Sequence, residues 1–286
     1  MDHNKKHHRP DTEQRPQPNQ HRWSVHVWTT WVKRYPSEDE SEDGADSLTE
    51  VQTAKLTHFF THLFDSDRDS IITLQDFESF TERVRHFTDW TINSGEYLVL
   101  QQVQQGFVHA FLAPNKSEHT SDAMVVDLYK QFLSVEEWLK HWSRLLAGVK
   151  SLQEMPIWLQ YLPKILFQAI NKSGSGRISR DELSAFYSSV MGFTAQRVGQ
   201  ILDEAYKAMT ASGDCTLTYA VYRLCFANFL LGRFPNGPGR YVFGMGDDPA
   251  TPSVPFPIDY SAMNTAPEDI EQYSNQGSTN RRSIVV

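Results

Sequence analysis

The sequence predicts an all-α fold, in which four helix–loop–helix units form two pairs within one compact globular domain. From Leu48 to about Gly244, apolar residues recur at helical spacing, as in Leu56, Phe59 and Leu63. The helical stretches also come in pairs, each joined by a short polar segment that carries one apolar residue. A chain of 286 residues that is 40% hydrophobic can bury a substantial core.

Composition excludes several classes of protein. The formal net charge of −8 argues against a nucleic-acid partner. The first residues, MDHNKKHHRP, lack the apolar stretch of a signal peptide, and no apolar run is long enough for a transmembrane segment. We therefore expect a cytoplasmic protein. The only cysteines, Cys215 and Cys225, are too few for a disulfide framework, so we expect reduced thiols.

Changes in composition predict the domain boundaries. Residues 1–47 form an N-terminal extension, polar and disordered at first, then aromatic over 23–35, and ending in the acidic run SEDESEDGAD at 37–46. We assign 48–150 to the first pair of units and 151–245 to the second. Residues 246–286 are polar and proline-containing, which predicts a loosely ordered tail; beyond Phe243 we expect only loose docking.

The aromatic segment of the extension has helical periodicity, with Trp28, Trp31 and Tyr35 on one face. We expect it to pack onto its own domain, because soluble proteins rarely leave such residues in water. Two alternatives are binding to a membrane surface and filling a groove between helices.

The loop of the first unit carries the strongest chemical signal. The segment DSDRDSIITLQD places Asp65, Asp67, Asp69 and Asp76 at the first, third, fifth and twelfth positions of a twelve-residue loop. Calcium prefers six to eight hard oxygen ligands at about 2.3–2.6 Å, and a tight loop can turn alternate side chains inward to supply them. This spacing is the EF-hand pattern, so the sequence predicts a Ca2+ site here.

The remaining positions of this loop also match. The backbone carbonyl of Ile71 stands at the seventh position, and Thr73 at the ninth could bind directly or through water. Ile72, at the eighth, is apolar as required for the short strand that pairs two such loops. The competing interpretation is a solvated acidic turn without a metal.

Two departures should weaken the site. Ser70 replaces the glycine of the sixth position, where a left-handed residue with a side chain costs roughly 1 kcal/mol. Asp76 replaces the usual glutamate, and its shorter side chain is less able to offer both oxygens. Six-coordinate Mg2+ therefore becomes a competitor for the same site.

The third loop, NKSGSGRISRDE, keeps EF-hand geometry but not its charge. Gly176 occupies the sixth position and Ile178 the eighth, whereas the early acidic positions hold neutral side chains. Its candidate ligands are Asn171, Ser173, Ser175, the carbonyl of Arg177 and Glu182. With one carboxylate, this loop is either a weak metal site or a loop retained for folding.

The other two loops should bind no metal. The fourth, TASGDCTLTYAV, has Asp214 and Leu217 but ends in Val221, which offers no side-chain oxygen. In the second, VDLYKQFLSVEE, the inward positions hold Val126, Leu128 and Lys130. We expect both units to be kept because EF-hands fold in pairs.

With these motifs placed, residues 48–244 resemble the invertebrate sarcoplasmic calcium-binding proteins and the related calexcitins, insect members in particular. The resemblance rests on DSDRDSIITLQD, NKSGSGRISRDE, EEWLKHW and the segment CFANFLLGRFPNGPGRYVFG. It implies a four-EF-hand fold and a calcium and magnesium buffer or, for calexcitin, a signalling protein. It supports Asp65, Asp67, Asp69 and Asp76 as ligands.

The sequence therefore predicts a monomeric, non-enzymatic calcium-binding protein that acts as a cytosolic buffer through one intact loop. The alternative is an EF-hand interaction or signalling protein, calcium-modulated or metal-independent, that holds a protein partner. No nucleophile, phosphate-binding glycine loop or acid–base pair stands outside the loops, which disfavours an enzyme.

Overall fold

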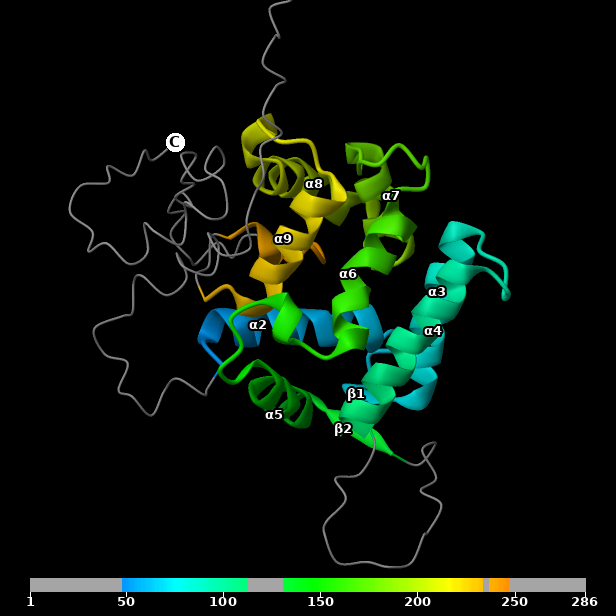
Figure 1. Cartoon of the computed structure of the whole chain (residues 1–286), viewed down its shortest axis with the longest axis vertical. Coiled ribbons are helices and arrows are strands. Elements are labelled where there is room, and N and C mark those ends of the chain that lie inside the picture. The colour runs from blue at the N-terminus through cyan, green and yellow to red at the C-terminus, as the bar shows by residue number, and fades with distance from the viewer. Residues whose placement is uncertain (1–47, 113–130, 234–236, 247–286) are drawn as a thin grey trace, which may run out of the picture.

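The computed structural model describes residues 48–112, 131–233 and 237–246. These residues are mostly helical, with one short two-stranded sheet, and the predicted all-α fold is confirmed (Figure 1). The N-terminal extension at 1–47, including its aromatic and acidic segments, lies outside the described residues. The tail from 247 onward lies outside them too.

Each helix–loop–helix unit is called a hand from here on. The first hand begins with helix α2 (Glu50–Phe59), whose start is fixed by a capping box between Thr49 and Gln52. The helix ends in a π-helical turn, η2 (Phe60–Phe64), directly before the loop. Strand β1 (Ile71–Thr73) follows, and helix α3 (Leu74–Thr88) completes the hand.

The second hand runs from helix α4 (Gly95–Phe107) through the π-helical turn η3 (Val108–Leu112) to strand β2 (Phe132–Ser134) and helix α5 (Val135–Leu146). The inward positions of its predicted loop, which hold Val126, Leu128 and Lys130, lie outside the described residues.

The second pair of hands begins after the 3-10 turn η5 (Leu152–Glu154). The third hand consists of α6 (Ile157–Ile170) and α7 (Arg180–Ser189), and the fourth of α8 (Ala195–Met209), the turn η6 (Ala211–Gly213) and α9 (Tyr219–Leu231). Figure 1 shows α6 to α9 grouped in the upper half, with α2 and α5 below them.

The loops pair through the residues at their eighth positions. Ile72 in β1 lies opposite Leu133 in β2 in an antiparallel register, and both side chains are buried. In the second pair, the Ile178 amide donates to the Leu217 carbonyl at 2.9 Å. The apolar eighth position therefore joins loops one and two, and loops three and four, as the sequence suggested for Ile72.

Aromatic side chains from several hands build the core. Trp138 of α5 is fully buried, and its indole nitrogen donates to the Leu56 carbonyl of α2 at 2.9 Å. Gly106 of α4 lies so close to Trp158 of α6 that a Cβ at this position would overlap the indole. This glycine lets the first and second pairs of hands approach closely.

Residues 237–246, here called the C-terminal plug, pack against α8 and α9 and reach α2 through Phe243. The plug contains the 3-10 turn η7 (Pro238–Tyr241), and the Gly239 amide donates to the Asn228 side chain at 2.9 Å. Tyr241 and the two residues after it are buried, and the last of them, Phe243, contacts α2 and α9 through its ring.

The last residues of the plug stay in contact with the domain. Gly244 and Gly246 are buried, and Arg197 donates to the Met245 carbonyl at 2.6 Å. Across the described ranges, no helix combines the length and apolar character needed to cross a membrane.

Candidate metal centre

The first loop gathers three carboxylates in one place. One oxygen from each of Asp65, Asp67 and Asp69 can be chosen so that all three lie within 4.8 Å of one another. Asp65 follows η2 directly and is 4% exposed, whereas Asp67 and Asp69 are exposed. The loop therefore brings together three of the four aspartates that the sequence predicts as ligands.

Backbone amides of the loop hold these carboxylates in position. The Asp69 amide donates to Asp65 Oδ1 at 3.1 Å, and the Ser70 amide donates to Asp65 Oδ2 at 3.2 Å. The Ile71 amide donates to Asp69 Oδ1 at 2.9 Å. The loop itself therefore fixes the carboxylates, since these turns need no distant part of the chain.

Ser70 adopts the left-handed conformation predicted for the sixth position, with φ of 68°. Arg68, at the fourth position, is also left-handed, with φ of 63°. Each non-glycine residue in this region costs roughly 1–2 kcal/mol. The loop therefore carries backbone strain at two positions, of which the sequence signalled only Ser70.

Asp76 has a different role from the other three acids. Its Oδ2 accepts hydrogen bonds from the Thr73 amide at 2.8 Å and the Thr73 hydroxyl at 2.7 Å, which form the capping box of α3. Asp76 is not part of the group of acids found within 4.8 Å in the described residues. The two hydrogen bonds from Thr73 both use Oδ2. A cation could therefore bind Oδ1 of Asp76 without breaking the capping box.

Electrostatics within the loop favour a cation. Burial raises the pKa of Asp65, and the neighbouring charges of Asp69 and Asp67 raise it further, although two backbone amides oppose the shift. A carboxylate whose charge is penalised by burial and by like charges gains most from a divalent ion. The first loop is therefore suited to bind a hard cation.

Arg83 is a neighbour of this site that the sequence analysis missed. It lies on α3 seven residues after Asp76, so both project from a similar face, and its guanidinium donates to the Leu63 carbonyl at the end of the preceding hand helix. Burial lowers the pKa of Arg83, and the charge of Asp76 opposes that shift. In the sequence, only the i, i+7 spacing could have signalled that Arg83 lies near Asp76.

In the third loop, the predicted ligands also converge. Ser175 Oγ donates to Asn171 Oδ1 at 3.2 Å, while Ser173 Oγ lies 3.1 Å from Ser175 Oγ. Ser175 Oγ also contacts the Arg177 carbonyl at 3.0 Å. Four of the five candidate ligand residues thus meet through their oxygens.

Glu182, the fifth candidate, closes the third loop from the start of α7. Its Oε1 accepts from the Ser173 amide at 3.0 Å, and its Oε2 accepts from the Ser179 amide at 2.8 Å. Burial opposes the charge of Glu182, but the hydrogen bonds from Ser179 and Ser173 outweigh it and lower the pKa of the carboxyl. Gly176 has φ of 77°, as its sixth position requires.

The fourth loop has a different conformation. Ala211 and Ser212 are left-handed within η6, and the Cys215 amide donates back to the Thr210 carbonyl at 2.9 Å. Val221, at the twelfth position, is buried in α9. This loop therefore offers no carboxylate from its closing position.

Comparisons with known proteins agree with this fold. No family model matches the chain. Two sets of sarcoplasmic calcium-binding proteins from Branchiostoma lanceolatum, forms I, III and IV and forms II, V, VI and VII, are each 23% identical over 184 residues. Each match covers 64% of this chain and 91% of the relative.

Among solved structures, a sarcoplasmic calcium-binding protein from amphioxus matches with a TM-score of 0.52 and 21% identity, covering 69% of this chain and 98% of that one. The coelenterazine-binding protein from Renilla muelleri in its Ca-loaded apo form has a TM-score of 0.42 and 20% identity, and covers 70% and 99%. The predicted resemblance to sarcoplasmic calcium-binding proteins is confirmed, whereas the likeness to insect members stays a prediction.

Proposed function

We propose that this chain binds calcium through the first loop and acts as a monomeric, non-enzymatic cytosolic buffer. The observation that carries the proposal is the convergence of Asp65, Asp67 and Asp69 within 4.8 Å, held by backbone amides. The similarity to sarcoplasmic calcium-binding proteins supports the same ligand.

The donor set fits a hard cation. The three aspartates, the Ile71 carbonyl and Asp76 supply oxygen only, which suits calcium or magnesium and disfavours the transition metals that prefer nitrogen and sulfur. Asp76 reaches less far than a glutamate, so we propose that Mg2+ competes for the same site. The third loop has one carboxylate, Glu182, among its candidate ligands, so it would bind calcium too weakly to give a second event in a titration, or would serve folding alone.

The C-terminal plug favours buffering over sensing. A calcium sensor exposes an apolar groove for its target when the ion binds. Here Phe243 of the plug fills the space between Phe59 of α2 and Phe229 of α9, with ring centroids 4.6 Å and 4.9 Å away. A target would have to displace this buried segment, at the cost of its apolar contacts.

Isothermal titration of the full chain tests the proposal directly. We expect one calcium-binding event, weakened when magnesium is present. Asp65→Asn should abolish it, since the amide keeps the shape and loses the charge, whereas the matched third-loop variant Glu182→Gln should leave it in place. A titration that shows no heat of calcium binding with or without magnesium would refute a calcium site in the first loop. A wild-type response from Asp65→Asn would refute it equally.

The second candidate is an interaction protein that uses the helical scaffold to hold a partner. The observation that favours it is the weakness of the later loops, since only Asp214 stands at an acidic ligand position of the fourth loop and Val221 closes it. A dye that fluoresces on apolar surfaces distinguishes the candidates: dye binding that rises with calcium supports sensing, and an unchanged signal supports buffering.

A further inference from the structure

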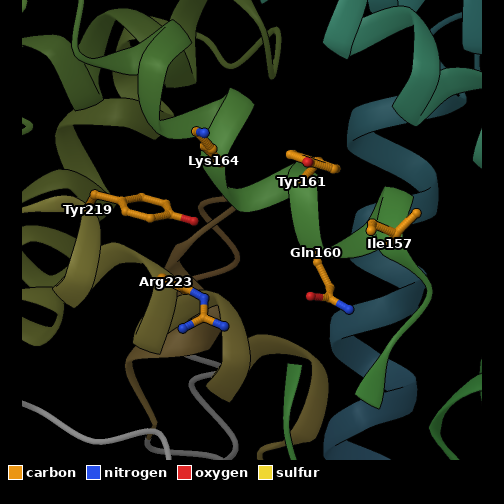
Figure 2. Close-up of a pocket in the computed structure, with 6 residues that line it drawn as sticks. All are labelled: Ile157, Gln160, Tyr161, Lys164, Tyr219 and Arg223. Carbon is orange, nitrogen blue, oxygen red and sulfur yellow. The ribbon is translucent and has the colours of Figure 1, made fainter. Parts of the chain in front are cut away.

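A pocket of about 330 Å3 lies between helices α6 and α9, and none of the candidate metal ligands of the first and third loops lines it. Figure 2 shows side chains from α6 on one side of it and two from α9, Tyr219 and Arg223, on the other. The α6 side chains that line it are Ile157, Gln160, Tyr161 and Lys164.

The pocket combines two cations with exposed apolar surface. Among the described residues, neither Lys164 nor Arg223 takes part in a salt bridge, in contrast to Arg85 and Arg180, which pair with Glu82 and Asp203. Beside these cations, Ile157 is 70% exposed and Tyr161 is 40% exposed. An occupant should therefore carry negative charge next to apolar or aromatic side chains.

We propose that this pocket holds the chain's own N-terminal extension, with the acidic run 37–46 at Lys164 and Arg223 and the aromatic segment 23–35 against Ile157 and Tyr161. The run contains six carboxylates within ten residues, and the segment before it contains Trp23, Trp28 and Trp31. The extension therefore carries both the negative charge and the aromatic side chains that the pocket's lining calls for.

The extension can reach the pocket from its point of attachment. It joins the described chain just before α2, and Gln52 of α2 donates to the Leu230 carbonyl near the end of α9 at 3.1 Å. Arg223 lies seven residues earlier on α9, which is about 10 Å along the helix axis. Five extended residues span about 16 Å, so the acidic run is long enough.

Docking there would tie the extension to the second pair of hands. The pocket is bounded by the first helix of the third hand, α6, and the last helix of the fourth hand, α9. A segment that bridges both helices would resist their separation, while the tryptophans of the extension leave water. The proposal does not depend on metal binding, because it uses no ligand residue of any loop.

Zero-length cross-linking with a carbodiimide tests the contact in the full chain, since this reagent joins a lysine amine only to a carboxylate that touches it. We expect a cross-linked peptide between Lys164 and the run 37–46. A mixture of light and heavy isotope-labelled chains should show that both halves come from one molecule. Lys164→Arg should remove the product, because it keeps the charge and loses the reactive amine.

A charge reversal provides an independent measurement. Arg223→Glu should reduce the cross-link several-fold and increase acrylamide quenching of tryptophan fluorescence, whereas the exposed α5 variant Lys140→Glu should change neither. The proposal is overturned if Lys164 couples only to other carboxylates or to none. It is overturned equally if the labels show a contact between two copies, or if Arg223→Glu behaves as Lys140→Glu does.

Discussion

The ring of Phe243 in the C-terminal plug stacks on the ring of Phe59 in α2, with centroids 4.6 Å apart and planes inclined by 29°. Phe59 also contacts Trp138 of the second hand and Phe229 of the fourth. One aromatic residue at the end of α2 thus connects the plug with both pairs of hands. The plug is therefore part of the core.

Truncating Phe243 of the plug should destabilise the whole domain. We expect Phe243→Ala to lower the free energy of unfolding by about 3–5 kcal/mol, because the fully buried ring leaves a cavity among aromatic neighbours. Phe132→Ala is the matched control: its ring is 64% exposed, so the loss should stay within about 0.5 kcal/mol. Urea denaturation measures both, and equal losses would contradict the role given to the plug.

His58, which contacts the plug, should also make stability depend on pH. His58 Nε2 lies 2.8 Å from the Phe243 carbonyl, and a carbonyl only accepts, so this nitrogen carries the hydrogen. Burial lowers the pKa of His58 to about 3, helped by His62, whose ring centroid is 4.3 Å away. Folded His58 therefore stays neutral at pH values where the unfolded chain takes up a proton.

The direction of the pH effect follows from proton linkage. Between the unfolded pKa near 6.5 and the folded value of about 3, the unfolded state binds more protons, so stability falls as pH falls. The loss is at most about 1.4 kcal/mol per pH unit. Urea titrations from pH 7 to pH 4.5 should show a smaller slope for His58→Gln. His86→Gln, whose ring is 72% exposed, should keep the wild-type slope.

Much of the fold followed from the sequence because helical periodicity and loop spacing are local signals. The apolar eighth position predicted the strand at Ile72, and loop chemistry predicted the left-handed Ser70. The plug could not be predicted in the same way. Its contacts join residues far apart in the chain, such as His58 and Phe243, and its sequence has no helical or strand period.

The candidate site shows the same division. The convergence of Asp65, Asp67 and Asp69 follows from spacing within one loop. The capping bonds between Thr73 and Asp76 were not anticipated, although a threonine three residues before an acid is a known cap signal. Arg83 was missed because its link to the loop runs through packing of two helices.

The space around two helical glycines predicts opposite effects of replacing them with alanine: Gly106 lies where α4 and α6 approach closely, and Gly199 lies in open space on α8. Gly106→Ala should destabilise by about 1–3 kcal/mol, because its Cβ would overlap the Trp158 side chain and force the two helices apart. Gly199→Ala, inside α8 with no neighbouring atom within 4 Å, should instead stabilise by about 0.5–1 kcal/mol. Thermal melts monitored by circular dichroism compare them, and shifts of the same sign would contradict this packing argument.

Lengthening the closing acid of the first loop should favour calcium over magnesium. Asp76→Glu keeps the capping interaction with Thr73, since glutamate is common at that position of a cap, and gives the carboxylate the reach to bind with two oxygens. We expect calcium affinity to rise roughly tenfold, equivalent to about 1.4 kcal/mol. Competition titrations should show magnesium displacing calcium less effectively; unchanged selectivity would mean that Asp76 does not contact the ion.

The third loop should become a second strong site when its charge is restored. Asn171 and Ser173 already converge with Ser175 and Glu182, so the missing element is anionic oxygen and not geometry. The double variant Asn171→Asp, Ser173→Asp should add one calcium per chain in titration calorimetry. Thermal stability should fall without calcium, because the new carboxylates repel Glu182, and rise with it, because the ion binds only the folded state.

The fourth loop supplies the control for this experiment. Ser212→Asp adds an acid at the third position beside Asp214 at the fifth, but Val221 still closes the loop without an oxygen. This variant should therefore gain no calcium and show no calcium-dependent rise in melting temperature. If the third-loop variant behaves in the same way, charge is not what limits binding there, and its network of serine hydroxyls serves folding alone.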